Sequence, residues 1–169
     1  MTHKKGFTLV EILTAVVIVA ILTVMAVPLY EKTIERSRLT EAQTVLNRLQ
    51  AAKIQAMDDM GCSSYSTADS ACPQLKHLRM QFKNECPSTS TATSFCSKAF
   101  KYSISPTGRM NNGVCAKRTG GDYSGTTFYY YSGEMNTDAN DKPEFLCVGT
   151  YCTEYGFEAN SGAGLTCPI

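Results

Sequence analysis

The sequence predicts an α+β fold, in which a long N-terminal helix, bent near Pro28, packs on a small antiparallel sheet in a disulfide-rich head. Three observations lead to this prediction. An apolar run near the N-terminus continues directly into an amphipathic stretch. Short segments of alternating apolar and polar residues, separated by turn residues, follow later in the chain. Eight cysteines occur, and all of them lie after the amphipathic stretch. A helix beside an antiparallel sheet buries the apolar face of both.

The apolar run at residues 7–27 has the length of a membrane span, and Glu11 is its one ionisable residue. A helix over this run is roughly 30 Å long, which is enough to cross the hydrocarbon core of a bilayer. Lys4 and Lys5 precede the run. The positive-inside rule therefore places this short end in the cytoplasm and the rest of the chain outside it. We expect a single-pass membrane anchor, with the spanning helix at residues 7–28.

A cleaved secretory signal peptide is the competing interpretation of this run. The small residue Ala26 would then mark a cut before Val27. Two features argue against it. Pro28 lies just past the cut, where it is awkward for an extended protease substrate. Glu11 adds an insertion cost of about 2–3 kcal/mol that a signal peptide has no reason to carry. An intramembrane carboxylate instead indicates a functional residue.

The sequence Gly-Phe-Thr-Leu-Val-Glu that begins at Gly6 follows two lysines and leads into the apolar run. This pattern resembles the N-terminus of type IV pilins and of the related pseudopilins, over roughly the first third of the chain. The resemblance implies a leader at residues 1–6, a cut between Gly6 and Phe7, and N-methylation of the new Phe7 amine. It also implies that Glu11 pairs with the Phe7 amine of a neighbouring subunit and that the head is a pilin-like roll. Independently, Pro28 removes one backbone hydrogen bond and is expected to bend the helix.

The same resemblance implies the partners and the location of the protein. The partners are copies of the chain in a helical filament, a prepilin peptidase, and the assembly machinery of the inner membrane. The precursor is expected in the inner membrane with its head outside the cytoplasm, and the assembled subunit in an extracellular pilus or a periplasmic pseudopilus. Two alternatives stay open: a type II secretion pseudopilin, and a monomeric bitopic membrane protein with a disulfide-rich ligand-binding head.

Charge and motifs give no indication of nucleic-acid binding or catalysis. Removal of the leader changes the formal net charge from +1 to −1, because 16 basic residues less Lys4 and Lys5 leave 14 against 15 acidic ones. So small a charge produces no strong field for nucleic acid or anionic lipid. The chain has no Gly-rich phosphate loop, no Gly-x-Ser-x-Gly motif and no nucleophile with an obvious histidine partner. We expect a structural protein without a cofactor.

Residues 29–60 continue the helix as an amphipathic segment that ends at Gly61. Its apolar side chains recur at spacings of three, four or seven, which is typical of a helix face packed on a core. The predicted apolar stripe consists of Leu39, Ala42, Leu46, Leu49, Ala56 and Met60, broadened by Val45 and Ala52. The predicted polar face consists of Glu35, Arg36, Arg38, Glu41, Asn47, Arg48 and Lys53.

Residues 61–169 form the predicted head. Residues 62–99 are rich in Ser, Thr, Pro and Cys and predict an irregular connection, with one or two helical turns at 75–82. Strands are expected at residues 100–104, 114–117, 127–132 and 145–148, because each segment is bounded by turn residues. Their close spacing indicates an antiparallel sheet, laid against the apolar stripe of the helix. Consecutive strand residues point to opposite faces, so Tyr129, Tyr130 and Tyr131 are not expected to form one stack.

Eight cysteines in a head of this size indicate an oxidising compartment and several disulfides. The candidates are Cys62, Cys72, Cys86, Cys96, Cys115, Cys147, Cys152 and Cys167. Equal spacings favour local loops between Cys62 and Cys72 and between Cys86 and Cys96. Cys167 is expected to tie the C-terminal tail to Cys147 or Cys152, as pilins commonly close a C-terminal loop. A zinc site is disfavoured because no Cys-x-x-Cys motif occurs.

A cluster of oxygen ligands before the last strand is a weak candidate for calcium. It consists of Asn136, Asp138, Asn140, Asp141 and Glu144. Dense carboxylate and amide oxygens suit Ca²⁺, but the spacing departs from that of an EF-hand loop. Lys142 and Pro143 favour a plain surface turn. We therefore expect no metal.

Overall fold

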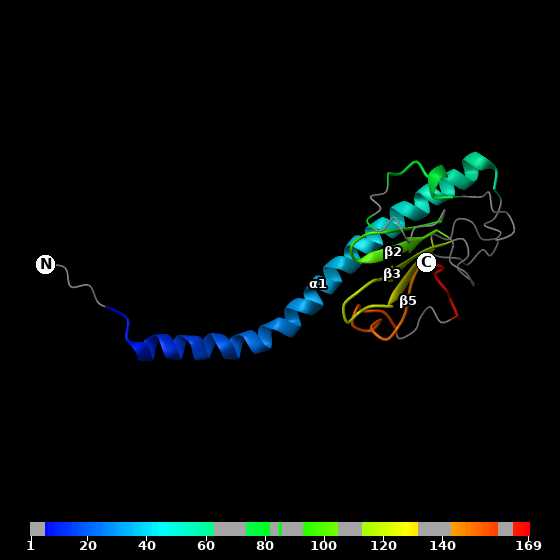
Figure 1. Ribbon diagram of the computed structural model, residues 1–169. Coiled ribbons are helices and arrows are strands. Elements are labelled where there is room, and N and C mark those ends of the chain that lie inside the picture. The colour runs from blue at the N-terminus through cyan, green and yellow to red at the C-terminus, as the bar shows by residue number, and fades with distance from the viewer. Residues whose placement is uncertain are drawn as a thin grey trace. The chain divides into compact units, whose positions relative to one another are not determined.

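The computed structural model describes residues 6–62, 74–81, 85, 93–104, 113–131, 143–158 and 164–169. The chain divides into two compact units, Met1–Ser37 and Arg38–Ile169. The helix α1 (Leu9–Met60) contributes its first part to the N-terminal unit and its second part to the C-terminal unit. The C-terminal unit also contains a short 3₁₀ helix η1 (Leu75–His77) and a β-sheet (Figure 1).

Helix α1 is 52 residues long, as the uninterrupted pattern in the sequence predicts, and its C-terminus is fixed by a glycine. Gly61 has φ of 67°, a conformation that suits a residue without a Cβ. Its N–H donates to the Asp58 carbonyl at 3.2 Å, and the Cys62 N–H donates to the Met57 carbonyl at 2.9 Å. These two bonds form a Schellman motif, which satisfies carbonyls that the helix end leaves open. The predicted stop at Gly61 is confirmed.

Within the described residues the sheet has five antiparallel strands in the simple order β1-β2-β3-β4-β5. The strands are β1 (Ser94–Cys96), β2 (Phe100–Ser103), β3 (Val114–Arg118), β4 (Thr127–Tyr131) and β5 (Glu144–Val148). Four of them match the predicted strands to within one residue at each end. Each strand therefore pairs with its neighbour along the chain, as the short connections imply.

Strand β1 is a correction to the prediction, which placed residues 62–99 in an irregular connection. Ser94 pairs with Ser103, and Phe95 pairs with Tyr102. The two rings stack with centroids 5.0 Å apart. The strand was not predicted because the Ser and Thr residues around it are typical of loops. The cross-strand aromatic pair supplies the apolar contact that holds this edge strand.

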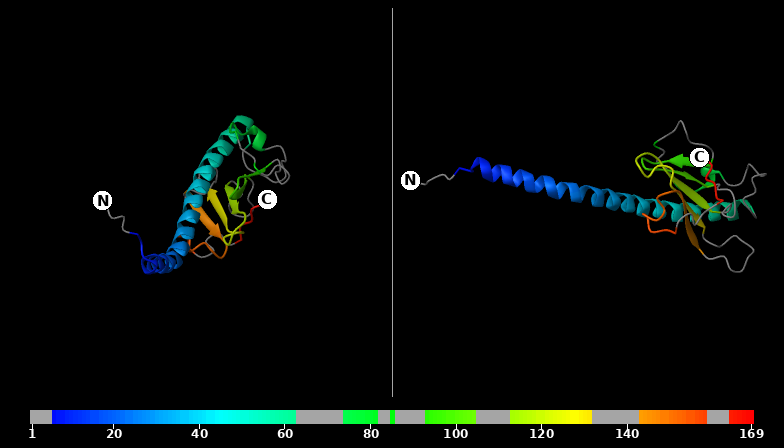
Figure 2. Two further views of the ribbon diagram at one scale, coloured as in Figure 1. Left: turned by 60° about the vertical axis from the view of Figure 1, so that its left-hand side comes forward. Right: turned by 90° about the horizontal axis from the view of Figure 1, so that it is seen from below.

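The second part of α1 packs across one face of the sheet, as Figures 1 and 2 show. The core between them combines helix residues with alternate strand residues. From the helix it includes Leu39, Ala42, Leu46, Leu49 and Ala56, and from the strands Phe95, Phe100, Tyr102, Val114, Ala116, Phe128 and Cys147. The predicted α+β fold is confirmed.

The predicted faces of α1 are right in their spacing and wrong at three positions. Glu35, assigned to the polar face, is 6% exposed, and it lies four residues before Leu39 in the stripe. Met60, at the last turn, is 38% exposed. Lys53, assigned to the polar face, is fully buried, as is Met57 one turn later. Lys53 lies four residues after Leu49 and three before Ala56, so the periodicity itself places it in the stripe. The prediction failed because it gave residue type more weight than position.

The buried Lys53 donates a hydrogen bond to the strand region of the sheet, while its apolar surroundings disfavour its charge. Its Nζ donates to the Gly113 carbonyl at 2.7 Å, at the start of β3. Burial disfavours the charged ammonium and lowers the pKa of Lys53 from its ordinary value of 10.5 to about 7. Above this value the folded head holds a neutral amine in its core. The head therefore contains an ionisable group whose charge depends on folding.

The opposite face of the sheet has its own small core beneath the C-terminal tail. It contains Cys115, Tyr129, Tyr131, Leu146 and Leu165. Tyr130, between two of these, instead stacks on Phe145 with ring centroids 4.5 Å apart and packs against the helix-facing core. The predicted alternation of the three tyrosines is confirmed.

Two disulfides join described residues, and they correct the predicted pairing of the tail. Cys167 bonds to Cys115, and Cys147 bonds to Cys152. The pairing of Cys167 with Cys147 or Cys152 is therefore wrong. The strand pleat explains it: Cys147 lies in the helix-facing core, whereas Cys115 lies on the face that the tail covers. The two sulfurs of Cys147 and Cys152 are also unavailable as zinc ligands.

The remaining predicted disulfides concern Cys62, Cys72, Cys86 and Cys96. Cys62 and Cys96 are each disulfide-bonded. Cys72 and Cys86, their predicted partners, lie outside the described residues. The local pairings therefore stay predictions. Within the described part of the chain no cysteine is free, which agrees with the oxidising compartment expected from the sequence.

We predict that head stability rises with pH between about 7 and 10.5 because of Lys53. In this window the unfolded chain holds a proton that the folded head has released, so higher pH favours the folded state. Between about pH 7 and about pH 9 the gain is about 2 kcal/mol. Lys53→Met should remove most of this rise. Urea unfolding of the full chain in detergent, followed by tyrosine near-UV circular dichroism, measures it.

The control is Lys117→Met, which changes an exposed lysine on β3. It should leave the slope of stability against pH as in wild type. An equal slope in wild type and Lys53→Met would show that burial of the amine does not control the stability of the head.

We predict that Cys167→Ser releases one thiol, at Cys115, and leaves the Cys147–Cys152 bond intact. The broken loop has a sequence separation of 52. On the chain-entropy model, closing this loop adds about 4 kcal/mol to the free energy of unfolding. Closing the five-residue Cys147–Cys152 loop adds about 2 kcal/mol. Peptide mapping after alkylation without reductant identifies the thiol. Labelling at Cys147 or Cys152 would contradict the pairing.

Candidate functional site: the N-terminal end of helix α1

The N-terminus of α1 is capped by two residues of the motif that begins at Gly6. Thr8 is the residue before the helix, and its Oγ1 accepts a bond from the Glu11 N–H at 3.3 Å. In return, the Thr8 N–H and Oγ1–H both donate to Glu11 Oε2, at 2.8 and 2.7 Å. This reciprocal arrangement is a capping box. Sequence reasoning missed the role of Thr8, although Thr-x-x-Glu before an apolar run is its signature.

The capping box uses one oxygen of the Glu11 carboxylate. Of the three hydrogen bonds in the box, the two that reach the carboxylate both end on Oε2, so within the described residues Oε1 has no role in the cap. A carboxylate near a helix N-terminus is also favoured by the helix dipole. The structure therefore gives Glu11 a local function in starting the helix. It leaves one face of the carboxylate available to a further hydrogen-bond donor.

The apolar side chains that follow this cap are exposed along the N-terminal unit. The large ones from Phe7 to Tyr30 range from 48% exposed at Val27 to 84% at Phe7. Among the described residues, one helix is long and apolar enough to cross a membrane, and its apolar part is not buried within the molecule. Exposed apolar surface of this extent indicates contact with lipid or with other protein. Residues 1–5, which include Lys4 and Lys5, lie outside the described residues.

Three threonines in this unit have their hydroxyl groups satisfied within the helix. Thr14 donates to the Val10 carbonyl at 3.0 Å, Thr23 to Val19 at 2.7 Å and Thr33 to Leu29 at 2.9 Å. A hydroxyl bonded to a carbonyl one turn back presents little unsatisfied polarity to an apolar environment. The threonines are therefore compatible with a helix that contacts lipid or packed helices on all sides.

Two further predicted features are the kink at Pro28 and the candidate calcium ligands. Helix α1 is continuous across Pro28, and the predicted kink at this residue stays a prediction. Of the weak calcium candidates, Asn136, Asp138, Asn140 and Asp141 lie outside the described residues, and Glu144 is exposed at the start of β5. No cluster of metal-ligating side chains occurs in the part of the chain that the structure describes.

A family model described as the prokaryotic N-terminal methylation motif matches residues 1–27. The chain carries a prepilin motif. The match supports a type IV pilin-like prepilin with a short class III leader. It also implies processing by a prepilin peptidase and association with a membrane, and it indicates a structural subunit rather than an enzyme. No solved structure matches the chain. The matched segment includes the whole capping box and most of the exposed apolar surface.

Proposed function

We propose that the protein is a structural subunit of a type IV pilus-like filament. It enters the inner membrane as a prepilin with its head outside the cytoplasm. A prepilin peptidase cleaves between Gly6 and Phe7, and the new amine of Phe7 is methylated. The subunit then polymerises into the filament through the apolar part of α1. The match to the methylation motif at residues 1–27, together with the exposed apolar helix, carries this proposal.

Cleavage before the apolar run, rather than after it, keeps the anchor and adds a positive amine to its end. Phe7 lies just before the first residue of α1 and Glu11 lies in its first turn, so the Phe7 amine and the Glu11 carboxylate are separated along the helix axis. A neighbouring subunit displaced along the axis by this amount brings its amine beside the Glu11 carboxylate. In an apolar environment an unpaired charge is costly, and pairing removes much of that cost. The charge pair would therefore favour one axial register.

The capping box fits this docking scheme. Thr8 holds the Glu11 side chain against the helix N-terminus through Oε2. The carboxylate is thus oriented before the neighbouring subunit arrives, which lowers the entropy cost of the pairing. Oε1 is then the acceptor for the methylated amine of the neighbour.

The disulfides of the head support a pilus subunit over a type II secretion pseudopilin. The Cys115–Cys167 bond fastens the C-terminal tail to the sheet. Pilins commonly close a C-terminal loop with a disulfide, whereas type II pseudopilins usually do not. A bitopic monomer with a ligand-binding head would need no register-setting carboxylate in its anchor.

We predict that the mature chain begins at N-methylated Phe7. Intact-mass and N-terminal peptide measurements on protein from the source cells should show loss of residues 1–6 and the mass of one added methylene. The apolar helix should be retained. A mature N-terminus at Val27 would instead establish a cleaved signal peptide and would contradict the anchor.

We predict that filament assembly needs the charge of Glu11 more than its role in the cap. Glu11→Ala removes both, and Glu11→Gln keeps a side chain that can cap but removes the charge. Both should insert and be cleaved normally, yet assembly should fail or fall sharply, because the neighbour's amine loses a partner worth on the order of 3–5 kcal/mol. Glu11→Asp should be intermediate, since the shorter side chain misplaces the charge. Filaments sheared from cells are counted by electron microscopy.

The matched control is Thr8→Val, which removes the capping hydroxyl and retains the carboxylate. Loss of a cap costs about 1 kcal/mol, so this variant should still assemble. If Glu11→Gln formed filaments of normal number and length, the charge-pairing scheme would be wrong. If Thr8→Val failed as completely as Glu11→Ala, the cap rather than the charge would be the essential feature.

A further inference from the structure

The first part of α1, blue in Figure 1, has a polar group near each end of its apolar run, at Glu11 and at Tyr30. Residues 12–29 between them contain no ionisable side chain, and Glu31 directly follows Tyr30. Glu11 and Tyr30 are nineteen positions apart, which corresponds to about 28 Å along a helix. The hydrocarbon core of a bilayer is about 30 Å thick. The distance between the two polar groups therefore matches the thickness of this core.

Tyr30 has the properties of a residue at a lipid interface. Its side chain is 67% exposed, and that of Leu29 before it is 68% exposed. The ring of a tyrosine is apolar, whereas its hydroxyl group donates and accepts hydrogen bonds. Such a side chain is most stable where hydrocarbon meets the headgroups, and Tyr is enriched at both interfaces of membranes. Tyr30 also stands where the apolar run gives way to charged residues, so it is suited to one edge of the hydrocarbon core.

Glu11 is suited to the opposite edge. The first four N–H groups of a helix have no carbonyl partner within it, and in hydrocarbon each needs another acceptor. Thr8 Oγ1 accepts from the Glu11 N–H, and a cap of this kind satisfies one or two of the four groups. Water and lipid headgroups can satisfy the others. The start of α1, together with the Glu11 carboxylate, is therefore most stable outside the hydrocarbon.

The segment between Glu11 and Tyr30 is compatible with hydrocarbon on every side. Its large apolar side chains range from 48% exposed at Val27 to 77% at Val24. The hydroxyl groups of Thr14 and Thr23 donate to carbonyls one turn back in the helix. No side chain of this segment therefore needs water.

We propose that the membrane-bound subunit occupies one register in the bilayer, in which the hydrocarbon core extends from Glu11 to Tyr30. The Glu11 carboxylate lies at the cytoplasmic interface, and the Tyr30 ring lies among the headgroups of the outer leaflet. This inference rests on the proposed function, which places the head outside the cytoplasm. The midpoint of the span lies between Ala20 and Ile21. A span over residues 7–28 would instead be centred three residues earlier, which is about 4.5 Å along the helix.

Tryptophan depth measurements test the register, because the chain contains no tryptophan of its own. Ile12→Trp and Leu29→Trp place the reporter at equal distances on either side of the proposed midpoint. Each full-length variant is reconstituted in dioleoylphosphatidylcholine vesicles, and its depth is obtained from quenching by lipids brominated at defined positions of the acyl chain. The two depths should agree to within one helical rise, about 1.5 Å. A span centred on residues 7–28 places the Ile12→Trp reporter about 9 Å deeper than the Leu29→Trp reporter, and that result would overturn the proposal.

The control for membrane insertion is Ile21→Trp, at the centre of the span. This reporter should be quenched most strongly by lipids brominated near the end of the acyl chain. If it is deep while the depths at residues 12 and 29 differ, the register is wrong and the membrane anchor stands. If none of the three reporters is quenched, the helix does not enter the bilayer, and the proposed function fails together with the register.

The outer interface is tested separately with Tyr30→Trp. Its emission should be blue-shifted relative to that of Arg48→Trp, which replaces an exposed residue in the second part of the same helix. Lipids brominated close to the headgroup should quench Tyr30→Trp more strongly than lipids brominated near the end of the acyl chain, and neither should quench Arg48→Trp. Emission equal to that of Arg48→Trp would place residue 30 in water, and strongest quenching near the chain end would place it in the core. Either result would overturn the assignment of Tyr30 to the interface.

Discussion

The packing of one stripe of α1 against the sheet is the interaction on which the head depends. Leu46 and Leu49 are fully buried there, as are Phe100 and Phe128 from the strands. Each such side chain contributes about 1.5–3 kcal/mol when it leaves water. The same helix has no such partner in the N-terminal unit, where its large apolar side chains are exposed. One continuous helix therefore provides a core element for the head and an apolar surface for lipid or for other helices.

Glu11 and Lys53 place an ionisable group in each of these two environments. Glu11 is accommodated by a capping box, in which its carboxylate receives two donors from Thr8. Lys53 is accommodated by a bond to the Gly113 carbonyl and by a lowered pKa. The first solution keeps the charge and satisfies it, which suits a group that must later attract an amine. The second gives up the charge near neutral pH, which suits a group that only has to be packed.

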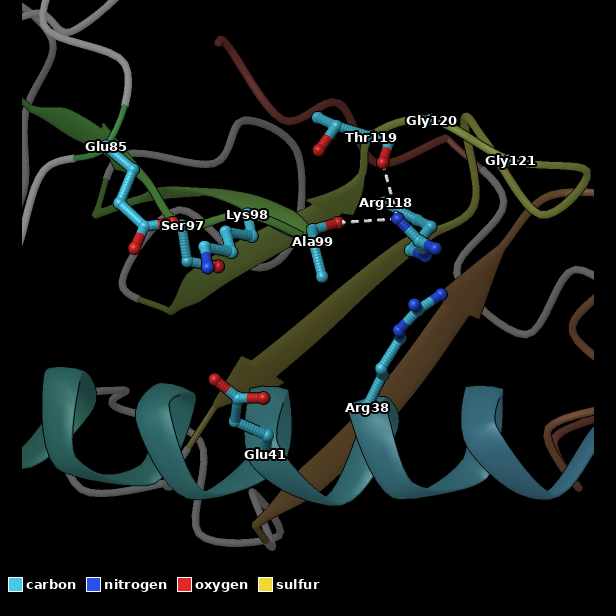
Figure 3. A pocket seen from close by; sticks show the side chains of 10 residues that line it. All are labelled: Arg38, Glu41, Glu85, Ser97, Lys98, Ala99, Arg118, Thr119, Gly120 and Gly121. Carbon is cyan, nitrogen blue, oxygen red and sulfur yellow. Dashed lines mark hydrogen bonds between the residues drawn. The ribbon is translucent and has the colours of Figure 1, made fainter. Parts of the chain in front are cut away.

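The sequence predicted those features that follow from periodicity and local signals. The long helix, its stop at Gly61 and four of the strands were found because apolar spacing and turn residues are local information. Contacts between residues far apart in the sequence could not be predicted in this way. The partner of Cys167 depends on which face of the sheet the tail covers, and β1 depends on the contact between Phe95 and Tyr102. Arg38 and Arg118, residues eighty positions apart, likewise line one pocket of the head (Figure 3), and no local pattern brings them together.

The bond between Cys115 and Cys167 also determines how the head would respond to mechanical tension. Tension applied between the N-terminal helix and the C-terminal tail passes directly from β3 to Cys167 through the sulfurs. Strands β4 and β5 lie inside this covalent loop and bear none of the load. Roughly 170 Å of extended chain is therefore unavailable for stretching while the bond is intact. Under oxidising conditions the head resists extension by covalent connectivity as well as by hydrogen bonds, and a reductant would convert the same head into a far more extensible element.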